Sequence, residues 1–437
     1  MFYEIQPVEQ QRNYKNMLKI IGNLTLLFSE SNCPYLPYRC HENIFCKYFE
    51  AINMGRLDCS ADAKKDRIGI GLKTWMGNDD QKVAEFGRLR PSYENLRGID
   101  LVRQIAEYRN ERIRITKNMH GIDEMIYHIV KRVPGRMKIL EHAFDYIDIA
   151  NIQLIENRGN DNNTYFTDGR HTYHFSMSKN TLYMIFSDLE ELDSFDVQIM
   201  ADPYSYLMKF KEESTEKTVE TIEVAKSLES PISYEFVSTF LKDVYEEKQK
   251  EQLCLRLYSV SREGIKFVGE KSGLNQWNAS GRNRDDNELY IPYLTLDRSR
   301  NKKFFPPRDT PFDLYLPDGT KLSAKVCQAA YARMPDADYE RLTDEEKQIE
   351  DERRLEGKAI MSNPNKDLGE WLLRKVFEIP PKTIVTYEML EKFGVDSVVF
   401  TKISDTEYKI DFSEIGTYEE FYGETDGESE SEELDEE

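Results

Sequence analysis

Two patterns of hydrophobic residues divide the chain and limit the folds that are open to it. Up to about residue 210, helical spacing, as in residues 1–30, alternates with strand-like spacing, as in the run Ile68–Leu72. From Leu253 onward, short strand-like runs alternate with turn signals such as Pro317-Asp318-Gly319. The sequence therefore predicts an α/β domain with a central mixed sheet flanked by helices, followed by a mostly-β domain, a small barrel or sandwich.

The predicted domain boundaries follow changes in composition. Residues 1–211 form the predicted first domain, and the polar segment 212–250 forms a helical connection. Residues 251–415 form the predicted second domain. Residues 416–437 are rich in Ser, Glu, Asp and Gly, which predicts an acidic, disordered tail.

The net charge of −21, from 59 Lys+Arg against 80 Asp+Glu, argues against nucleic-acid binding when it is taken for the whole chain. The charge is uneven, however. Residues 411–437 hold 13 acids and no base, and residues 335–356 hold ten acids and four bases. Residues 60–120 have 13 bases against nine acids, and residues 271–310 have eight against five. These two basic regions are compatible with DNA binding.

The sequence also predicts a compartment. No run approaches the ~18 consecutive apolar residues of a membrane helix, and the N-terminal residues lack the basic flank and apolar core of a secretory signal. The six cysteines have spacings that fit no strong zinc pattern, so they are predicted to be reduced thiols. We expect a cytoplasmic protein without membrane association.

A predicted β-hairpin carries candidate catalytic residues. Residues 57–74 alternate on both sides of a turn at Lys65-Asp66. Asp58 and Asp62 lie on one face of the first strand, and Lys73 lies at the end of the second. Metal-dependent phosphodiester hydrolysis uses carboxylates to hold Mg²⁺ and benefits from a lysine that orients water and steadies developing charge.

This hairpin resembles the active-site hairpin of the PD-(D/E)XK nucleases, the superfamily of most type II restriction endonucleases. It departs from that pattern at Gly71, where the family usually has an acidic residue two positions before the lysine. A variant of the family carries the acid on a following helix, and Glu85, 12 positions after Lys73, matches that variant. Glu42, on the predicted helix 41–52, matches an additional helical glutamate of these enzymes.

The resemblance implies a magnesium site with one catalytic lysine. It assigns Asp62, Glu85 and Glu42 as metal ligands and Lys73 as the catalytic lysine, with Asp58 as the alternative to Asp62 for the first ligand. The alternative interpretation is a solvated surface hairpin with charged neighbours and no catalytic role.

The C-terminal half contains an ordered series of short motifs. They are GRN at 281–283, YIP at 290–292, FFPPR at 304–308, a strand ending in Gln328, and GKA followed by SNPNKDLGEWLLRK. Together they resemble the B3-like DNA-recognition domain of effector-dependent and two-domain type II restriction enzymes. The resemblance implies a pseudobarrel whose first and second arms enter the major groove of duplex DNA.

The resemblance also implies DNA contacts. It places Asn275, Trp277, Arg282, Asn283 and Arg284 on the first arm, and Gln328, Tyr331, Arg333, Lys358 and Asn363 on or beside the second. Arginine bonds guanine bidentately and asparagine bonds adenine, whereas Lys302, Lys303 and Arg308 suit phosphates. The acidic insert 335–356 departs from the family pattern and puts the role of Arg333 in doubt. A solvated turn is the alternative for residues 282–284.

Taken together, the two resemblances imply a type II restriction endonuclease. It would hydrolyse double-stranded DNA with Mg²⁺ in defence against foreign DNA, as a homodimer, within a system that includes a cognate DNA methyltransferase not in physical contact with it. The alternative is a non-catalytic, sequence-specific DNA-binding regulator with a degenerate nuclease-like domain. A B3-like domain argues against RNA, because the A-form major groove is too narrow to read.

Overall fold

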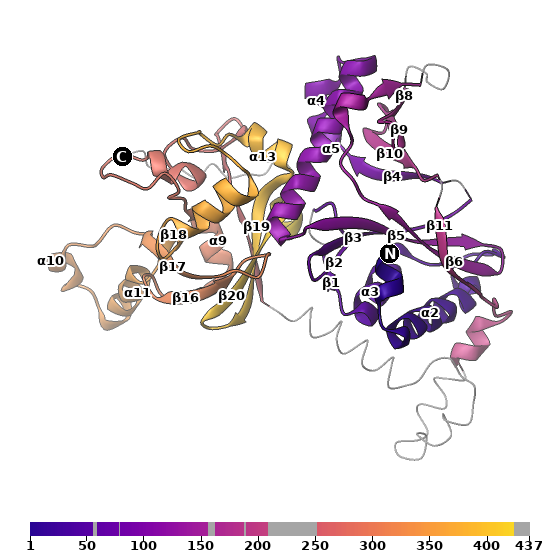
Figure 1. Cartoon of the computed structure of the whole chain (residues 1–437). Coiled ribbons are helices and arrows are strands. Elements are labelled where there is room, and N and C mark those ends of the chain that lie inside the picture. Colours follow the sequence, from indigo (N-terminus) through magenta and orange to yellow (C-terminus); the bar gives the residue numbers. More distant parts are fainter. Residues whose placement is uncertain (56–58, 78, 156–161, 188, 209–250, 424–437) are drawn as a thin grey trace. The chain divides into compact units, whose positions relative to one another are not determined.

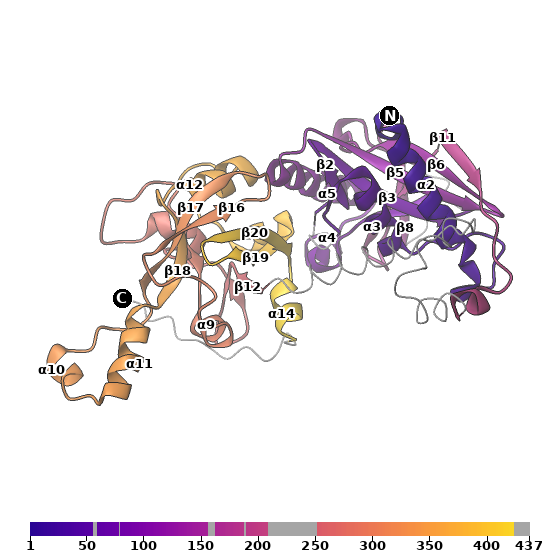
Figure 2. The same cartoon turned by 90° about the horizontal axis from the view of Figure 1, so that it is seen from below.

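The computed structural model describes residues 1–55, 59–77, 79–155, 162–187, 189–208 and 251–423 (Figures 1 and 2). The chain divides into two compact units. Unit 1 comprises Met1–Ile113 and Ile122–Gln249, and unit 2 comprises Arg114–Gly121 and Lys250–Glu437. The predicted connection 212–250 lies outside the described residues. No helix in the described ranges combines the length and the apolar character that a membrane crossing requires.

Unit 1 is built on a mixed six-stranded sheet, in agreement with the predicted fold class (Figure 1). The strand order is β1-β2-β3-β5-β6-β11, and all neighbours are antiparallel except β3 and β5. The strands are β1 (Ile52–Asn53), β2 (Ala63–Lys65), β3 (Ile68–Met76), β5 (Glu124–Val133), β6 (Arg136–Ala143) and β11 (Glu190–Asp196).

A separate hydrophobic core lies on each face of this sheet. Because successive strand residues point to opposite faces, Ile70 and Leu72 of β3 join the core under the N-terminal helices, whereas Trp75 joins the other core. The first core is covered by α1 (Phe2–Ile5), α2 (Val8–Asn23), η1 (Thr25–Leu27) and α3 (Tyr38–Phe49). These helices confirm the helical pattern predicted near the N-terminus.

The second core lies between the central sheet, two helices and a second sheet of order β4-β10-β9-β8-β7. The elements are η2 (Gly87–Leu89), α4 (Arg90–Tyr93), α5 (Gly98–His120), η3 (Ile149–Asn151), β4 (Asp80–Glu85), β7 (Gln153–Leu154), β8 (Asn163–Thr167), β9 (Thr172–Ser176) and β10 (Thr181–Ile185).

Two local predictions for unit 1 have opposite outcomes. The predicted hairpin is confirmed, because β2 and β3 pair antiparallel with Ala63 opposite Ile70. The helix that the variant motif implied around Glu85 is absent, because residues 80–85 form β4 and pair with β10. The segment contains good helix formers, yet pairing with a strand almost a hundred residues later overrides this weak local propensity.

Unit 2 is a nearly closed, barrel-like sheet of seven strands. The order is β12-β19-β20-β16-β17-β18-β15, and only β16 and β20 are parallel. The turn predicted at Asp318-Gly319 joins β16 to β17, and Gly319 has a φ of 88° there. The strands are β12 (Gln252–Arg256), β15 (Ile291–Pro292), β16 (Pro311–Tyr315), β17 (Lys321–Ala329), β18 (Gly357–Ser362), β19 (Val395–Ser404) and β20 (Glu407–Glu414), with β13 (Ser259–Val260) and β14 (Lys266–Phe267) as a small separate pair.

The described residues of unit 2 also form helices. They are η4 (Gly273–Asn278), α9 (Thr295–Arg300), α10 (Asp336–Tyr339), α11 (Asp344–Arg354), α12 (Asp367–Gly369), the π-helical η5 (Glu370–Val376), α13 (Tyr387–Phe393) and α14 (Thr417–Tyr422). The end of α5 also belongs to unit 2, where Ile115 and Met119 join its core and Arg114 donates to the carbonyl of Phe377. The predicted boundaries did not include this segment in the second domain.

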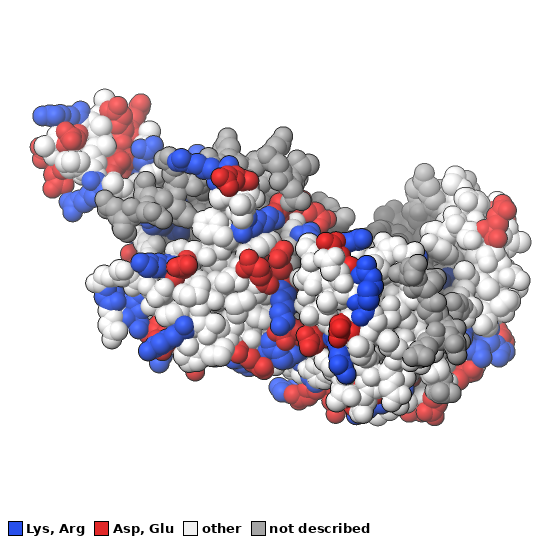
Figure 3. Space-filling view, turned by 90° about the horizontal axis from the view of Figure 1, so that it is seen from above, with Lys and Arg blue, Asp and Glu red and all other residues white. Residues whose placement is uncertain are grey.

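The acidic insert forms two helices between β17 and β18. Thr343 and Glu346 make a reciprocal capping box that starts α11. The insert begins and ends at neighbouring positions, because Ala329 pairs with Gly357 and the amide of Ala330 donates to the carbonyl of Glu356. Its acidic and basic side chains gather on the protrusion seen in Figure 3.

The predicted start of the tail at residue 416 is wrong, because α14 packs onto the barrel. Tyr418 is 1% exposed, and its hydroxyl donates to Asp297 at 2.7 Å. The Glu419 carboxylate accepts a hydrogen bond from Tyr258 and pairs with Lys266. The sequence does not indicate that Tyr418 is buried, because acidic residues surround it in the chain.

Two truncations are expected to differ sharply. Ending the chain after Phe412 removes α14, and since loss of one large buried aromatic side chain costs about 3–5 kcal/mol, we expect a strongly lowered thermal midpoint. Ending it after Gly423 removes nine acids of residues 424–437, which should leave the midpoint unchanged and raise non-specific DNA affinity. Thermal unfolding and DNA titrations check both. Equal midpoints for the two truncations would contradict the role given to α14.

Candidate functional site

Three of the predicted catalytic residues come together in unit 1. Glu42 lies on α3, Asp62 directly precedes β2, and Lys73 lies on β3. The pairing of β2 with β3 ends at Ala63 and Ile70, because β2 is short. The amide of Leu72, beyond this pair on β3, donates instead to the Asp62 carboxylate at 2.7 Å. Arg39, one turn before Glu42 on α3, donates from Nη1 to its carboxylate at 3.1 Å. Each carboxylate is therefore held by a specific donor.

The charges of these three residues act on one another. Burial, followed by the charge of Asp62, raises the pKa of Glu42, while Arg39 and Lys73 oppose the shift. Burial also raises the pKa of Asp62 against the opposing effect of Lys73. Burial lowers the pKa of Lys73, and the positive charge of Arg109 lowers it further. Such perturbed groups that interact electrostatically are typical of functional sites.

The absence of an acid at position 71 has a steric explanation. A Cβ on Gly71 would lie 2.8 Å from the ring of Tyr127 and 3.0 Å from that of Phe144. These two rings stack with their centroids 4.1 Å apart, and Arg109, which is 2% exposed, donates to the Tyr127 hydroxyl at 2.9 Å. An aromatic pair and a buried arginine thus fill the space in which an acidic side chain at position 71 would lie.

The remaining predicted ligands are placed differently. Glu85 lies at the end of β4, where its exposed carboxylate pairs with Lys82, so it is not on a helix as predicted. None of the described contacts joins Glu85 to Glu42, Asp62 or Lys73. Asp58 lies outside the described residues.

The donor set in unit 1 suits a magnesium ion completed by other oxygens. Mg²⁺ is commonly bound through one or two carboxylates, with water and substrate phosphate filling the remaining positions. Glu42 and Asp62 supply two carboxylates, and a nearby cation would offset the repulsion that contributes to the raised pKa of Glu42. Within the described ranges, no group of three His, Cys, Asp or Glu side chains forms a metal site. Glu42 and Asp62 could therefore hold a metal ion whose coordination is completed by water or substrate oxygens.

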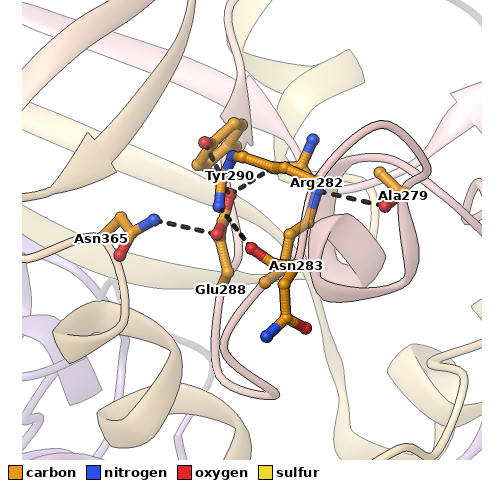
Figure 4. Close-up of polar contacts among 7 residues, drawn as sticks. Ala279, Arg282, Asn283, Glu288, Tyr290 and Asn365 are labelled. Carbon is orange, nitrogen blue, oxygen red and sulfur yellow. Dashed lines mark hydrogen bonds and ion pairs between the residues drawn. The ribbon is translucent and has the colours of Figure 1, made fainter.

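In unit 2, the first arm (residues 273–290) is organised around one buried carboxylate (Figure 4). Arg282 and Arg284 both pair with Glu288, which is 0% exposed. Arg284 is 13% exposed and also donates to the carbonyl of Ala279, whereas the Arg282 side chain is 48% exposed. Asn283 is exposed as well. Two of the three predicted contacts at 282–284 therefore face solvent, and Arg284 holds the loop together.

The prediction that Asn275 contacts bases does not fit its position. Asn275 is fully buried, donates to the carbonyls of Gly269 and Val385, and accepts a hydrogen bond from the amide of Val385. These bonds occupy its amide and tie η4 to the segment before α13. Trp277, on the same turn, is partly exposed.

The first arm packs against the motif SNPNKDLGEWLLRK, residues 362–375, which is called its seat below. Asn365 donates to Glu288 at 2.9 Å, and Arg374 donates to the side chain of Asn287 at 2.7 Å. A Cβ on Gly369 would lie 1.7 Å from the carbonyl oxygen of Asn287, so only glycine allows this approach. The motif therefore positions the first arm, which the resemblance alone did not indicate.

The predicted residues of the second arm (residues 329–357) and its surroundings are mostly exposed. Tyr331 lies between the guanidinium groups of Arg298 and Arg353, and Arg333 pairs with Asp336 of α10. Lys303 lies 3.5 Å from Glu352 of α11. The other exposed residues of this set are Gln328, Lys358, Asn363 and Lys302, while Arg308 is partly buried beside Asp309.

Sequence reasoning did not identify Glu288, Asn365, Gly369 or Arg109. A carboxylate four positions after Arg284 and directly before the apolar run 289–291 was the available signal for Glu288. The contact with Asn365 spans 77 positions and has no local signal.

The comparisons with known proteins concern the C-terminal part of the chain. Residues 248–404 match the family model of the NgoFVII C-terminal B3-like DNA-binding domain, which comes from the restriction enzymes. The comparison with curated proteins finds no match. The matched residues include every strand of the barrel-like sheet except β20, together with both arms and the Glu288 cluster, so this part of the chain is a B3-like DNA-binding domain and DNA is its partner.

Proposed function

We propose that this protein is a type II restriction endonuclease that hydrolyses phosphodiester bonds of double-stranded DNA with Mg²⁺, in defence against foreign DNA. The DNA-binding domain at 248–404 supports binding to a duplex. The observation that carries cleavage is the gathering of Glu42, Asp62 and Lys73, from three separate segments, into one group of interacting charges.

The carboxylates and the lysine have distinct proposed roles. Glu42 and Asp62 would hold Mg²⁺, which supplies Lewis-acid activation of water and neutralises phosphate charge. The hydrogen bonds from Arg39 and from the Leu72 amide keep these carboxylates oriented. Glu85, exposed on β4, remains a proposed ligand only if its pair with Lys82 opens.

Lys73 acts on the phosphate and on the attacking water. Its ammonium group steadies the negative charge that develops on the phosphate oxygens as water attacks phosphorus in line. The N–H donors of the same ammonium group orient the attacking water and polarise it.

Recognition is proposed to lie on the two arms of unit 2. Arg282 and Asn283 are the exposed candidates for base contacts on the first arm, and Lys302, Lys303 and Lys358 are candidates for phosphates. Cleavage of both strands at a symmetric site requires two active sites, so we propose a homodimer. A cognate DNA methyltransferase would protect the host sites without contacting this protein.

Supercoiled plasmid tests the proposed function. Incubation of the full chain with plasmid and Mg²⁺ should give nicked and linear products with 5′-phosphate and 3′-hydroxyl ends. The same incubation with EDTA should leave the plasmid intact, while binding to a short duplex persists. Products that form equally with EDTA would refute the magnesium mechanism.

A second candidate function is a DNA-binding regulator without catalysis. One observation favours it: the exposed carboxylate of Glu85 pairs with Lys82, and none of the described contacts joins it to Glu42 or Asp62. Sequence-selective binding together with an intact plasmid across a range of Mg²⁺ concentrations would support this candidate over the nuclease.

A further inference from the structure

The carboxylate of Glu288 is the most highly connected polar group of the first arm (Figure 4). Its Oε1 accepts hydrogen bonds from Arg282, from Arg284 at 2.6 Å and from the Tyr290 hydroxyl at 2.8 Å. Its Oε2 accepts from Asn365 at 2.9 Å. Three of the four donors are on Oε1 and one is on Oε2, so neither oxygen of this fully buried carboxylate is left without a hydrogen bond.

Within the cluster of Glu288, Arg282 and Arg284, the charges leave one positive charge, although the arm also carries Asp285 and Asp286. A buried carboxylate is costly unless it is paired, and two guanidinium groups provide that pairing. One negative and two positive groups sum to a net charge of +1. The excess lies where the arm is exposed, because the Arg282 side chain is 48% exposed and that of Arg284 only 13%.

Arg282 is held through both of its terminal nitrogens and keeps further N–H donors. Its Nη2 donates to Glu288, and its Nη1 donates to the carbonyl of Asn283 at 3.2 Å. A guanidinium group has five N–H donors in a fixed fork, so donors remain for a further partner. Fixing the fork in this way reduces the rotamer freedom that Arg282 would otherwise lose on binding.

The Glu288 cluster is attached to a firmly packed element. Asn365 follows β18, and Arg374 on η5 donates to the side chain of Asn287 at 2.7 Å and to the carbonyl of Asp286 at 2.5 Å. The close approach of Gly369 to Asn287 adds a steric support. The position of the Glu288 carboxylate is therefore set by the barrel, not only by the loop.

We propose that Glu288 is a positioning residue for base recognition: it holds the Arg282 guanidinium group in the orientation that reads one base pair in the major groove. This inference rests on the proposed role of the first arm in reading DNA. Arg282 presents its remaining N–H donors to a guanine, which pairs bidentately with arginine through O6 and N7. Glu288 itself does not contact DNA.

The test measures sequence preference and not only affinity. Wild-type full chain selects binding sequences from a pool of short duplexes with randomised centres, in EDTA to prevent cleavage. The preferred duplex and the unselected pool are then titrated with the wild type and with Glu288→Gln, Arg282→Ala and Asp313→Asn. Asp313 pairs with Lys321 on the β16–β17 hairpin, so Asp313→Asn is a matched charge-removal control outside the arm.

Glu288→Gln should lower affinity for the preferred duplex by about tenfold or more, the range expected for one bidentate base contact. It should also flatten the preference at the same base pair as Arg282→Ala. Affinity for the unselected pool should stay equal or rise, because one negative charge is lost. Asp313→Asn should keep the wild-type preference.

The possible failures can be told apart. A preference that Arg282→Ala leaves unchanged refutes the proposed role of the first arm. A preference that Arg282→Ala flattens but Glu288→Gln preserves refutes the positioning role alone. If Glu288→Gln does not fold, Asn365→Ala decides, because it removes one bond to Glu288 from outside the arm. It should weaken the preference at the same base pair, and an unchanged preference would overturn the proposal.

Discussion

Replacing Lys73 with alanine is expected to abolish plasmid cleavage while leaving DNA binding intact. Lys73 lies on β3 beside Asp62 and Glu42, and its charge interacts with both. Removal of one preorganised group that stabilises transition-state charge typically costs about 10²–10³-fold in rate. We therefore expect nicking of supercoiled plasmid with Mg²⁺ to slow by at least about 100-fold. Titration of a short duplex in EDTA should give wild-type affinity, because the DNA-binding domain is in unit 2.

Lys138→Ala provides the matched control for this experiment. Lys138 is on β6 of the same sheet and pairs with Glu191 at 2.7 Å at the surface. Exposed ion pairs contribute little to stability, so this variant should cleave at the wild-type rate. Rapid cleavage by Lys73→Ala would remove Lys73 from the mechanism. Equal slowing of both variants would point to a general effect of net charge and contradict a specific role.

Replacing Gly369 with alanine is expected to displace the first arm from its seat. The new Cβ would lie 1.7 Å from the carbonyl oxygen of Asn287, and this neighbour is backbone, so the segment 285–288 must move. Overpacking of this kind costs about 1–3 kcal/mol. The displacement should break the Asn365–Glu288 and Arg374–Asn287 hydrogen bonds. We expect a lowered thermal midpoint and affinity for the preferred duplex reduced by about tenfold or more.

Gly87→Ala is a suitable control, because the nearest atom to a Cβ at that position is 3.9 Å away. It should change neither thermal unfolding nor duplex affinity. Gly369→Ala that binds the preferred duplex as tightly as the wild type would show that the arm does not depend on this seat.

The sequence predicted those parts of the fold that are local. The β2–β3 hairpin and the turn at Asp318-Gly319 carry their own alternation and turn residues, and both are confirmed. The sequence around Glu85 does not indicate the strand β4, because its partner β10 is distant in the sequence. The predicted start of the tail at residue 416 is too early, because Tyr418 lies in an acidic stretch of sequence and yet is buried.

The same distinction holds for the candidate sites. The motif led to Asp62 and Lys73, which share a hairpin with defined faces. Glu288 and Asn365 were not predicted, because their contact exists only after the barrel has formed. The sequence did not indicate either that Asn275 is fully buried or that Arg284 points inward. Residue type suggested the chemistry at these positions, and the tertiary contacts decided which side chains are accessible.

The two ends of the acidic insert meet on adjacent strands. Because of this geometry, the fold of the barrel does not depend on the length of the insert. Since Ala329 pairs with Gly357, whatever joins β17 to β18 leaves and re-enters the sheet at one place. The largest apolar core of unit 2 includes no residue from 330 to 356. Evolution can therefore lengthen, shorten or recharge this connection at little thermodynamic cost. Diversity among relatives of this barrel is expected to concentrate there, while the seat of the first arm tolerates almost none.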